Sequence, residues 1–145
     1  MTLHDVQKDG TNVDLILTDG DVVAGTWVEN INNLHMANYY LQNSTAANND
    51  EITFPIRLGK GTYDVHIVYT TNSNHGKLDV SLDSQVIINQ LDLYSVAVIR
   101  NVTHEESNVV LNGGDYTLSL KVNGKNGASS SYYVTVAYIS FRRVA

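Results

Sequence analysis

The eleven residues GTYDVHIVYTT, Gly61–Thr71, decide the fold class of this chain. Apolar or aromatic side chains occupy alternate positions of this stretch: Tyr63, Val65, Ile67 and Tyr69. The positions between them include the polar residues Asp64 and His66. Because successive side chains of a β-strand point to opposite faces, this alternation predicts a strand with one face in a core and the other toward solvent.

The same period-two pattern recurs along the chain, in residues 13–17, 52–58, 78–82 and 116–122. Short clusters such as LGKG, NSNHG, LDSQ and NGGD separate these runs, and their Gly, Asn, Asp and Ser residues are typical of turns. No amphipathic helical pattern extends beyond a turn or two. Short strands with turns between them predict an all-β fold, an antiparallel β-sandwich. Pro55 lies inside one run and predicts an edge strand or a bulge there.

Two segments depart from simple alternation. Residues 28–50 are rich in Asn, and they predict a long irregular loop that wraps an edge of the sandwich. Residues 133–141 carry apolar side chains on both faces, which predicts a strand covered on both sides. The stretch before it, NGKNGASSSY, has low strand propensity and predicts a loop that crosses between the sheets.

Composition restricts the classes of protein and partner. A chain of 145 residues favours a single domain. The formal charge of −6 opposes binding to phosphates, so nucleic acid is not expected as a partner. No window approaches the roughly 20 apolar residues of a membrane span, so no membrane association is expected. The start, MTLHDVQKDG, does not have the pattern of a secretory signal, and the absence of cysteine excludes disulfides.

Catalytic motifs are not evident in the sequence. Four pairs of acidic residues are candidates for acid–base chemistry: Asp19 with Asp21, Asp50 with Glu51, Asp79 with Asp83, and Glu105 with Glu106. Adjacent acids on a strand point to opposite faces, whereas glycoside hydrolysis needs two carboxyls that face each other. No nucleophile elbow or phosphate-binding loop occurs, and the five histidines lack the spacing of a zinc site. We therefore expect no enzyme activity and no cofactor.

A structural calcium ion is the alternative to a cofactor-free protein. The loop NNDE supplies oxygen ligands of the type that calcium prefers, with Asn48, Asp50 and Glu51 as candidates. Turn chemistry alone also accounts for these residues. Both interpretations stay open at this point.

Several segments, taken in order, resemble a known family. They are DEITFPIRLGKGTYDVHIVYTT, GKLDVSLDSQVI, LDLYS and LNGGDYTLSLKVNGKNGASSSYYVTVAYISFRR. Together they resemble the galactose-binding-like jelly rolls of carbohydrate-binding modules. They are more similar to a version found in bacteriophage virion proteins, through GTW, NSTAANNDEI, GTY, DLYS and KNGASSSY before a final RR. The resemblance implies two packed antiparallel sheets, with ligand sites in the loops at one end or on a concave face.

The resemblance covers residues 25–143. We therefore expect residues 1–24 to form an N-terminal arm or first strand that could serve for attachment, and residues 25–145 to form the jelly roll of a single domain. It also implies a function: a non-enzymatic virion protein, made in the host cytoplasm and exposed on the virion surface as a capsid decoration or fibre component. The implied partners are its own copies in a trimer, a capsid or tail protein, and a cell-surface glycan.

The alternative function is a carbohydrate-binding module that recognises polysaccharide through loop aromatics. Sugar rings stack on exposed aromatic faces, while amides and carboxylates bind hydroxyls. The candidate contacts for a glycan or a neighbouring subunit are Trp27, Tyr39, Tyr40, Tyr94 and Tyr132. An open groove lined by Trp27 and Tyr40 with polar neighbours would favour the module over the virion protein.

Overall fold

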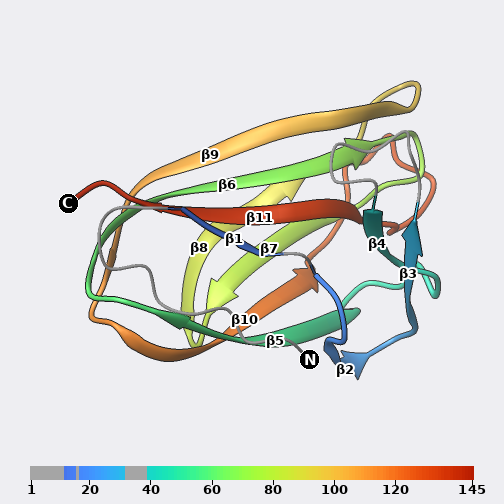
Figure 1. Ribbon diagram of the computed structural model, residues 1–145. Helices are drawn as coiled ribbons and strands as arrows, with labels where there is room; N and C mark the ends of the chain where they lie inside the picture. The colour runs from blue at the N-terminus through green and yellow to red at the C-terminus, as the bar shows by residue number, and fades with distance from the viewer. Residues whose placement is uncertain (1–11, 16, 32–38) are drawn as a thin grey trace.

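The computed structural model describes residues 12–15, 17–31 and 39–145, which form eleven β-strands and no helix. Within these residues, accordingly, no helix has the length and apolar character needed to span a membrane. The strands form two antiparallel sheets packed face to face as a jelly-roll sandwich (Figure 1). The predicted fold class is confirmed.

The first sheet has six strands in the order β3-β4-β11-β6-β9, with β1 also pairing with β11. Their bounds are β1 (Asn12–Leu15), β3 (Trp27–Ile31), β4 (Tyr39–Asn43), β6 (Gly61–Thr71), β9 (Ile99–Leu111) and β11 (Thr135–Arg143). In Figure 1, β9, β6 and β11 run side by side across the upper half of the view. This sheet carries the candidate site.

The second sheet has five strands in the order β2-β5-β10-β7-β8. Their bounds are β2 (Asp21–Ala24), β5 (Glu51–Leu58), β7 (Lys77–Leu82), β8 (Gln85–Asp92) and β10 (Gly114–Val122). Strand β2 pairs with β5 only at Glu51–Thr53, so β5 is an edge where Pro55 lies. Because proline cannot donate to a neighbouring strand, this position suits it, and the prediction for Pro55 is confirmed.

The inner faces of both sheets form one hydrophobic core. The alternate residues predicted in Gly61–Thr71 belong to it: Tyr63, Val65, Ile67 and Tyr69. Their counterparts in β5 and β10 include Phe54, Ile56 and Leu118, all fully buried. Burial of a side chain of this size stabilises the fold by about 1.5–3 kcal/mol, so period-two patterning on several strands is sufficient to specify the sandwich.

Strand β11 differs from its prediction at one point. Its register against β6 shifts between Val136 and Tyr138, which marks a bulge. As a result Val136 and Ile139 both point into the core, although strict alternation predicted them on opposite faces. Ala137 is 1% exposed, which confirms that β11 is covered on both sides at this point.

The segment 28–50 is more regular than predicted. Strand β3 pairs with β4 from Trp27↔Asn43 to Ile31↔Tyr39, and β4 pairs with β11. The prediction of a continuous loop was wrong for these strands, because pairing at a sheet edge overrides the low strand propensity of Asn. Residues 32–38 lie outside the described part of the chain. The crossing loop 123–134 is confirmed, since it joins β10 in one sheet to β11 in the other.

The described parts of residues 1–24 contribute two strands to the sandwich. Strand β1 pairs with β11 along its four residues, and β2 pairs with β5. The attachment role for residues 1–24 stays a prediction, and residues 1–11 and 16 of this segment lie outside the described part.

Candidate functional site

A shallow hollow opens on the outward face of the six-stranded sheet and has a volume of about 160 Å³. We call it the polar hollow, and it is lined by Tyr40, Gln42, Thr70, Asn72, His75, Val98, Arg100 and Thr135. An engineered cavity of about 150 Å³ holds one benzene molecule. The polar hollow therefore has room for one six-membered ring.

A row of polar side chains crosses three strands in this hollow. Thr135 of β11 lies opposite Gln42 of β4 on one side and opposite Thr70 of β6 on the other. Residues directly opposite in an antiparallel sheet share a face, and the chain neighbours of this row are core residues, so the row points outward. The Gln42 amide Nε2 donates a hydrogen bond of 3.0 Å to Thr135 Oγ1.

His75 is only 3% exposed and contacts the Thr135 side chain of this row. Its Nδ1 lies 2.8 Å from Asn74 Oδ1, and its Nε2 lies 2.9 Å from Thr135 Oγ1. An amide oxygen only accepts hydrogen bonds, so Nδ1 carries the proton and Nε2 accepts the proton of the Thr135 hydroxyl. Burial lowers the pKa of His75 to about 4, so the ring is neutral at pH 7.

The hydrogen-bond chain fixes the direction of each group. Gln42 donates to Thr135, Thr135 donates to His75, and His75 donates to Asn74. Because each hydroxyl and ring proton is committed, the chain holds the Gln42 amide in one orientation. Its other end, the Oε1 acceptor, forms no hydrogen bond with any described residue.

Other groups in the hollow are also available to a ligand. The Asn72 side-chain oxygen accepts from the Ser73 backbone N–H at 2.8 Å, while its amide nitrogen has no partner in the described part of the chain. Tyr40 adds an aromatic ring and Val98 an apolar side chain to the wall. An unused amide atom and an aromatic ring in one hollow suit sugar recognition, since amides bind hydroxyls and rings stack on the sugar.

Three of the predicted aromatic contacts lie on β3 and β4. Tyr40 lines the polar hollow. Tyr39 points the other way and is buried, with its hydroxyl donating to the Leu17 carbonyl oxygen. Burial, with a smaller effect from the nearby Glu29 carboxylate, raises the pKa of Tyr39. Trp27 is half-buried against the core, and its Nε1 donates to the Ala24 carbonyl oxygen at 3.1 Å.

The other two predicted aromatics belong to the loops. Tyr132 is half-buried, packs against the core and has the Lys125 ammonium 5.7 Å from its ring centroid. Tyr94 forms an isolated bridge with Asn72. The structure thus brings Tyr40 into the hollow and does not bring the remaining four with it. A glycan role for those four stays a prediction.

Sequence reasoning did not single out the remaining residues of the hollow. These are Gln42, Thr70, Asn72, His75, Val98, Arg100 and Thr135. One signal was present: Thr135 interrupts the apolar run of β11, and Thr70 follows the core residue Tyr69. Both threonines are at most 5% exposed, and a buried polar side chain on a sheet face needs a specific partner.

The candidate calcium ligands each accept hydrogen bonds from other groups of the protein. Asp50 is buried, and its Oδ2 accepts hydrogen bonds from Asn43 Nδ2 at 2.9 Å, Thr45 Oγ1 at 2.7 Å and the Ala47 N–H at 2.9 Å. Asn48 Oδ1 instead accepts from the Gly124 N–H, and Glu51 Oε2 accepts from Ser119 Oγ. These oxygens are thus bound by protein donors, which accounts for the three residues by turn and strand contacts; a calcium site at them stays a prediction.

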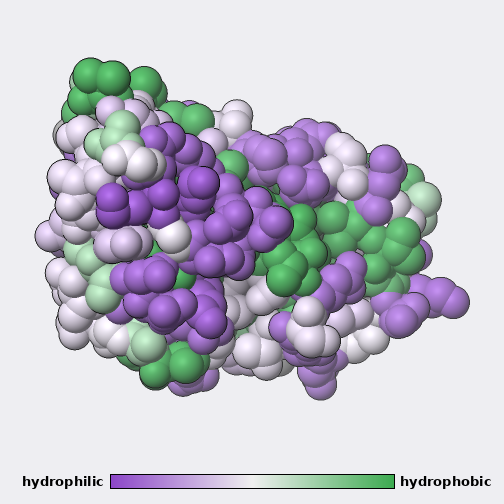
Figure 2. All heavy atoms as spheres, turned by 180° about the vertical axis from the view of Figure 1, so that it is seen from behind, coloured by the Kyte–Doolittle hydropathy of each residue, from purple (hydrophilic) through white to green (hydrophobic). Residues whose placement is uncertain are grey.

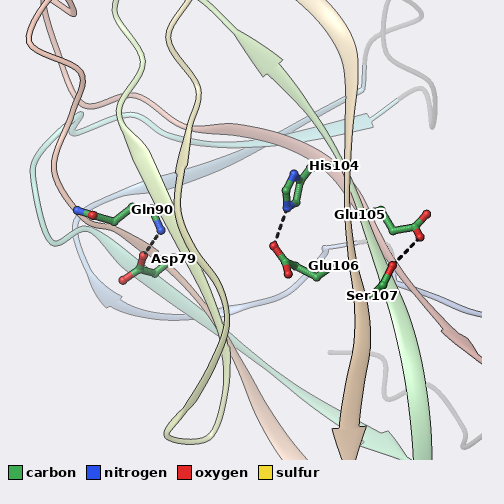
Figure 3. A network of polar contacts seen from close by, with 6 residues as sticks. All are labelled: Asp79, Gln90, His104, Glu105, Glu106 and Ser107. Carbon is green, nitrogen blue, oxygen red and sulfur yellow. Dashed lines mark hydrogen bonds and ion pairs between the residues drawn. The ribbon is translucent and has the colours of Figure 1, made fainter.

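Histidines and glutamates gather on β9 but point in different directions. Figure 3 shows His104 with Glu106 on one side of the strand and Glu105 with Ser107 on the other. His104 Nε2 lies 2.9 Å from Glu106 Oε1, while Glu105 Oε2 lies 2.9 Å from His66 Nε2 on β6. No three His, Asp or Glu side chains come together as a metal site within the described residues.

The pair Asp79 and Asp83 has structural partners. Asp79 accepts from the Gln90 N–H at 2.7 Å (Figure 3) and from Asn123 Nδ2 at 2.8 Å. Asp83 accepts from the Thr117 N–H at 2.8 Å. These contacts link β7 and its turn to neighbouring strands, which is a stabilising role.

Apolar side chains border the hollow on its β9 side. Figure 2 shows hydrophobic atoms at the upper left corner, the end of the molecule at which the β8–β9 connection lies. Val96 in this connection is 84% exposed, and Val98 and Ile99 are 43% and 52% exposed. The hollow is therefore polar at its floor and partly apolar at its rim.

Solved structures with this architecture include carbohydrate-binding modules. A CBM36-1 domain of a multidomain xylanase from the hindgut metagenome of Trinervitermes trinervoides has a TM-score of 0.70 at 17% identity, covering 93% of this chain and 99% of that one. A carbohydrate-binding module CBM36 in complex with calcium and xylotriose has a TM-score of 0.58 at 13% identity, covering 90% and 98%. The likeness shows the fold.

A larger protein also contains this fold. Paenibacillus xanthan lyase has a TM-score of 0.76 at 20% identity, covering 90% of this chain but only 13% of that one. This chain therefore spans a small part of the length of the lyase. No protein-family model and no curated protein matches the sequence. Nothing in these likenesses indicates a bacteriophage origin.

Proposed function

We propose that this chain is a carbohydrate-binding module and that one sugar residue of a polysaccharide binds in the polar hollow. The observation that carries the proposal is the hollow itself: a ring-sized recess lined by Tyr40, in which Gln42 Oε1 and Asn72 Nδ2 have no partner among the described residues. The named CBM36 structures support it through their fold and through the xylotriose bound to one of them.

The arrangement suits binding with little rearrangement. The Gln42 amide is already oriented by Thr135 and His75, so a sugar hydroxyl that donates to Gln42 Oε1 meets a fixed acceptor. The Asn72 amide nitrogen supplies a donor for a second hydroxyl, and the Tyr40 ring supplies a surface for the apolar face of the sugar. Affinity from one such site is modest, because the hollow is shallow and open to water.

Isothermal titration calorimetry with a panel of neutral and acidic oligosaccharides tests the proposal. We expect Gln42→Ala and Asn72→Ala to weaken binding by up to about tenfold each, the effect of one hydrogen bond. The matched control is Thr103→Ala, because Thr103 is an exposed residue on β9 outside the hollow. If Tyr132→Ala abolishes binding while Gln42→Ala leaves it unchanged, the sugar binds at the loops and the assignment to the hollow is wrong.

Binding without catalysis is part of the proposal. The acidic pairs Asp79 with Asp83 and Glu105 with Glu106 are held in structural contacts, as described above. We expect oligosaccharides to be recovered intact after prolonged incubation with the protein, measured by chromatography. Shortened products would contradict this part. The proposal does not depend on calcium, because the groups that it assigns to the sugar all line the polar hollow.

The virion hypothesis remains a prediction. The virion surface location, the capsid or tail partner and the trimer all come from the sequence resemblance, and no contact in the structure bears on them. Light scattering after size exclusion tests the trimer, which would have a mass of three times 16.0 kDa. A monomer would remove the assembly argument and leave the glycan proposal unaffected.

A further inference from the structure

The charges around the polar hollow differ in sign from the chain as a whole. The chain has 15 acidic and 9 basic residues, yet none of the residues that line the hollow is an aspartate or glutamate. Arg100 is the one fully charged side chain among them, since His75 is neutral at pH 7. The hollow is therefore a small positive site on an acidic protein.

Arg100 is also the one arginine that has no partner within residues 12–15, 17–31 and 39–145. The chain has four arginines, all in the described part. Arg57 pairs with Asp115 at 2.8 Å, and Arg142 and Arg143 each interact with other residues. Among the residues that the structure describes, none forms a hydrogen bond or ion pair with the Arg100 guanidinium. Its N–H donors are available to a ligand in the hollow.

From these observations we infer that the polar hollow takes an acidic sugar, a uronic acid residue whose carboxylate binds Arg100. This inference rests on the proposed function and names the class of its ligand. A guanidinium presents parallel N–H donors that match the two oxygens of a carboxylate, and such charge-assisted pairs are about twice as strong as neutral hydrogen bonds. A hexuronate places this carboxylate and several hydroxyls on one six-membered ring, the size that fits the hollow.

The negative charge of the whole protein does not prevent this contact. At 0.1 M salt, exposed charges more than about 10 Å apart are largely screened from each other. Acidic residues beyond this distance therefore act weakly on a ligand in the hollow, whereas Arg100 lines the hollow itself. The uncharged amides of Gln42 and Asn72 bind sugar hydroxyls without repelling the carboxylate.

The test compares matched ligands that differ in one charge per residue. Affinity is measured by calorimetry for uronate oligosaccharides and for the same oligosaccharides with methyl-esterified carboxyls. A third set consists of oligosaccharides without carboxyl groups that carry sulfate esters. The variants are Arg100→Gln, Arg100→Lys and, as the control of equal charge change, Arg57→Gln on the other sheet. Because Arg100 is exposed and has no partner in the described part of the chain, its variants should keep the thermal stability of the parent.

We expect an acid to bind about tenfold more tightly than its methyl ester. Arg100→Gln should abolish that difference, Arg100→Lys should retain part of it, and Arg57→Gln should leave it unchanged. Equal binding of acid and ester by the parent protein would overturn the inference and leave the glycan-binding function standing. Tighter binding of sulfated than of uronate sugars would overturn the assignment to a carboxylate. Failure to bind any sugar on the panel would overturn both proposals.

Discussion

His75 makes the stability of this protein depend on pH in a defined window. The ring is 3% exposed, and burial lowers its pKa from 6.5 to about 4 in the folded state. Between pH 6.5 and pH 4 the unfolded chain therefore binds a proton that the folded chain does not, and stability falls as the pH falls. At 1.36 kcal/mol per pKa unit, the free energy of unfolding falls by about 3 kcal/mol in total. About 2 to 3 kcal/mol of this loss is reached at pH 4.5.

The assay is urea unfolding of the parent protein and of His75→Gln between pH 7.5 and pH 4.5. The difference between the two pH profiles isolates His75, because other groups titrate in both proteins. His104→Gln removes a half-exposed histidine and serves as the control. The parent should lose about 2 to 3 kcal/mol more than His75→Gln over this range. Parallel profiles would refute the argument that burial keeps this ring neutral.

Three further predictions concern residues whose contacts stabilise the fold or the polar hollow. Asp50→Ala removes the acceptor of three hydrogen bonds and should lower the free energy of unfolding by about 3 kcal/mol, measured with urea; an unchanged midpoint would contradict this. Gly25→Ala should lower it by at least about 1 kcal/mol, since Gly25 has φ of +82° and an added Cβ would collide with the Asp50 carboxylate; a thermal shift of zero would count against this. Thr135→Val keeps the shape of the side chain but removes the hydroxyl that joins Gln42 to His75. We expect sugar affinity to fall and the free energy of unfolding to drop by about 1–3 kcal/mol. A calorimetric affinity equal to that of the parent would show that this hydroxyl does not orient the site.

The strands and turns could be predicted from the sequence because their causes are local. The strand pleat repeats every two residues, so the alternation in Gly61–Thr71 predicts which side chains enter the core whatever lies around it. The loop before β11 follows in the same way from its Gly, Asn and Ser residues. The irregular interpretation of residues 28–50 failed because β3 is stabilised by pairing with β4, and β4 by pairing with β11, and not by local propensity.

The candidate site was decided by the tertiary structure. Gln42 and Thr135 are 93 residues apart and His75 and Thr135 are 60 apart, yet each pair is joined by a hydrogen bond. Their contact depends on which strands become neighbours and in what register, a choice made by packing the whole core at once. By itself the sequence determined an acidic, cysteine-free β-sandwich with Tyr40 among its exposed candidates. Only the fold placed Tyr40 and Arg100 around the same hollow, because side chains on different strands come together only when the sheet has formed.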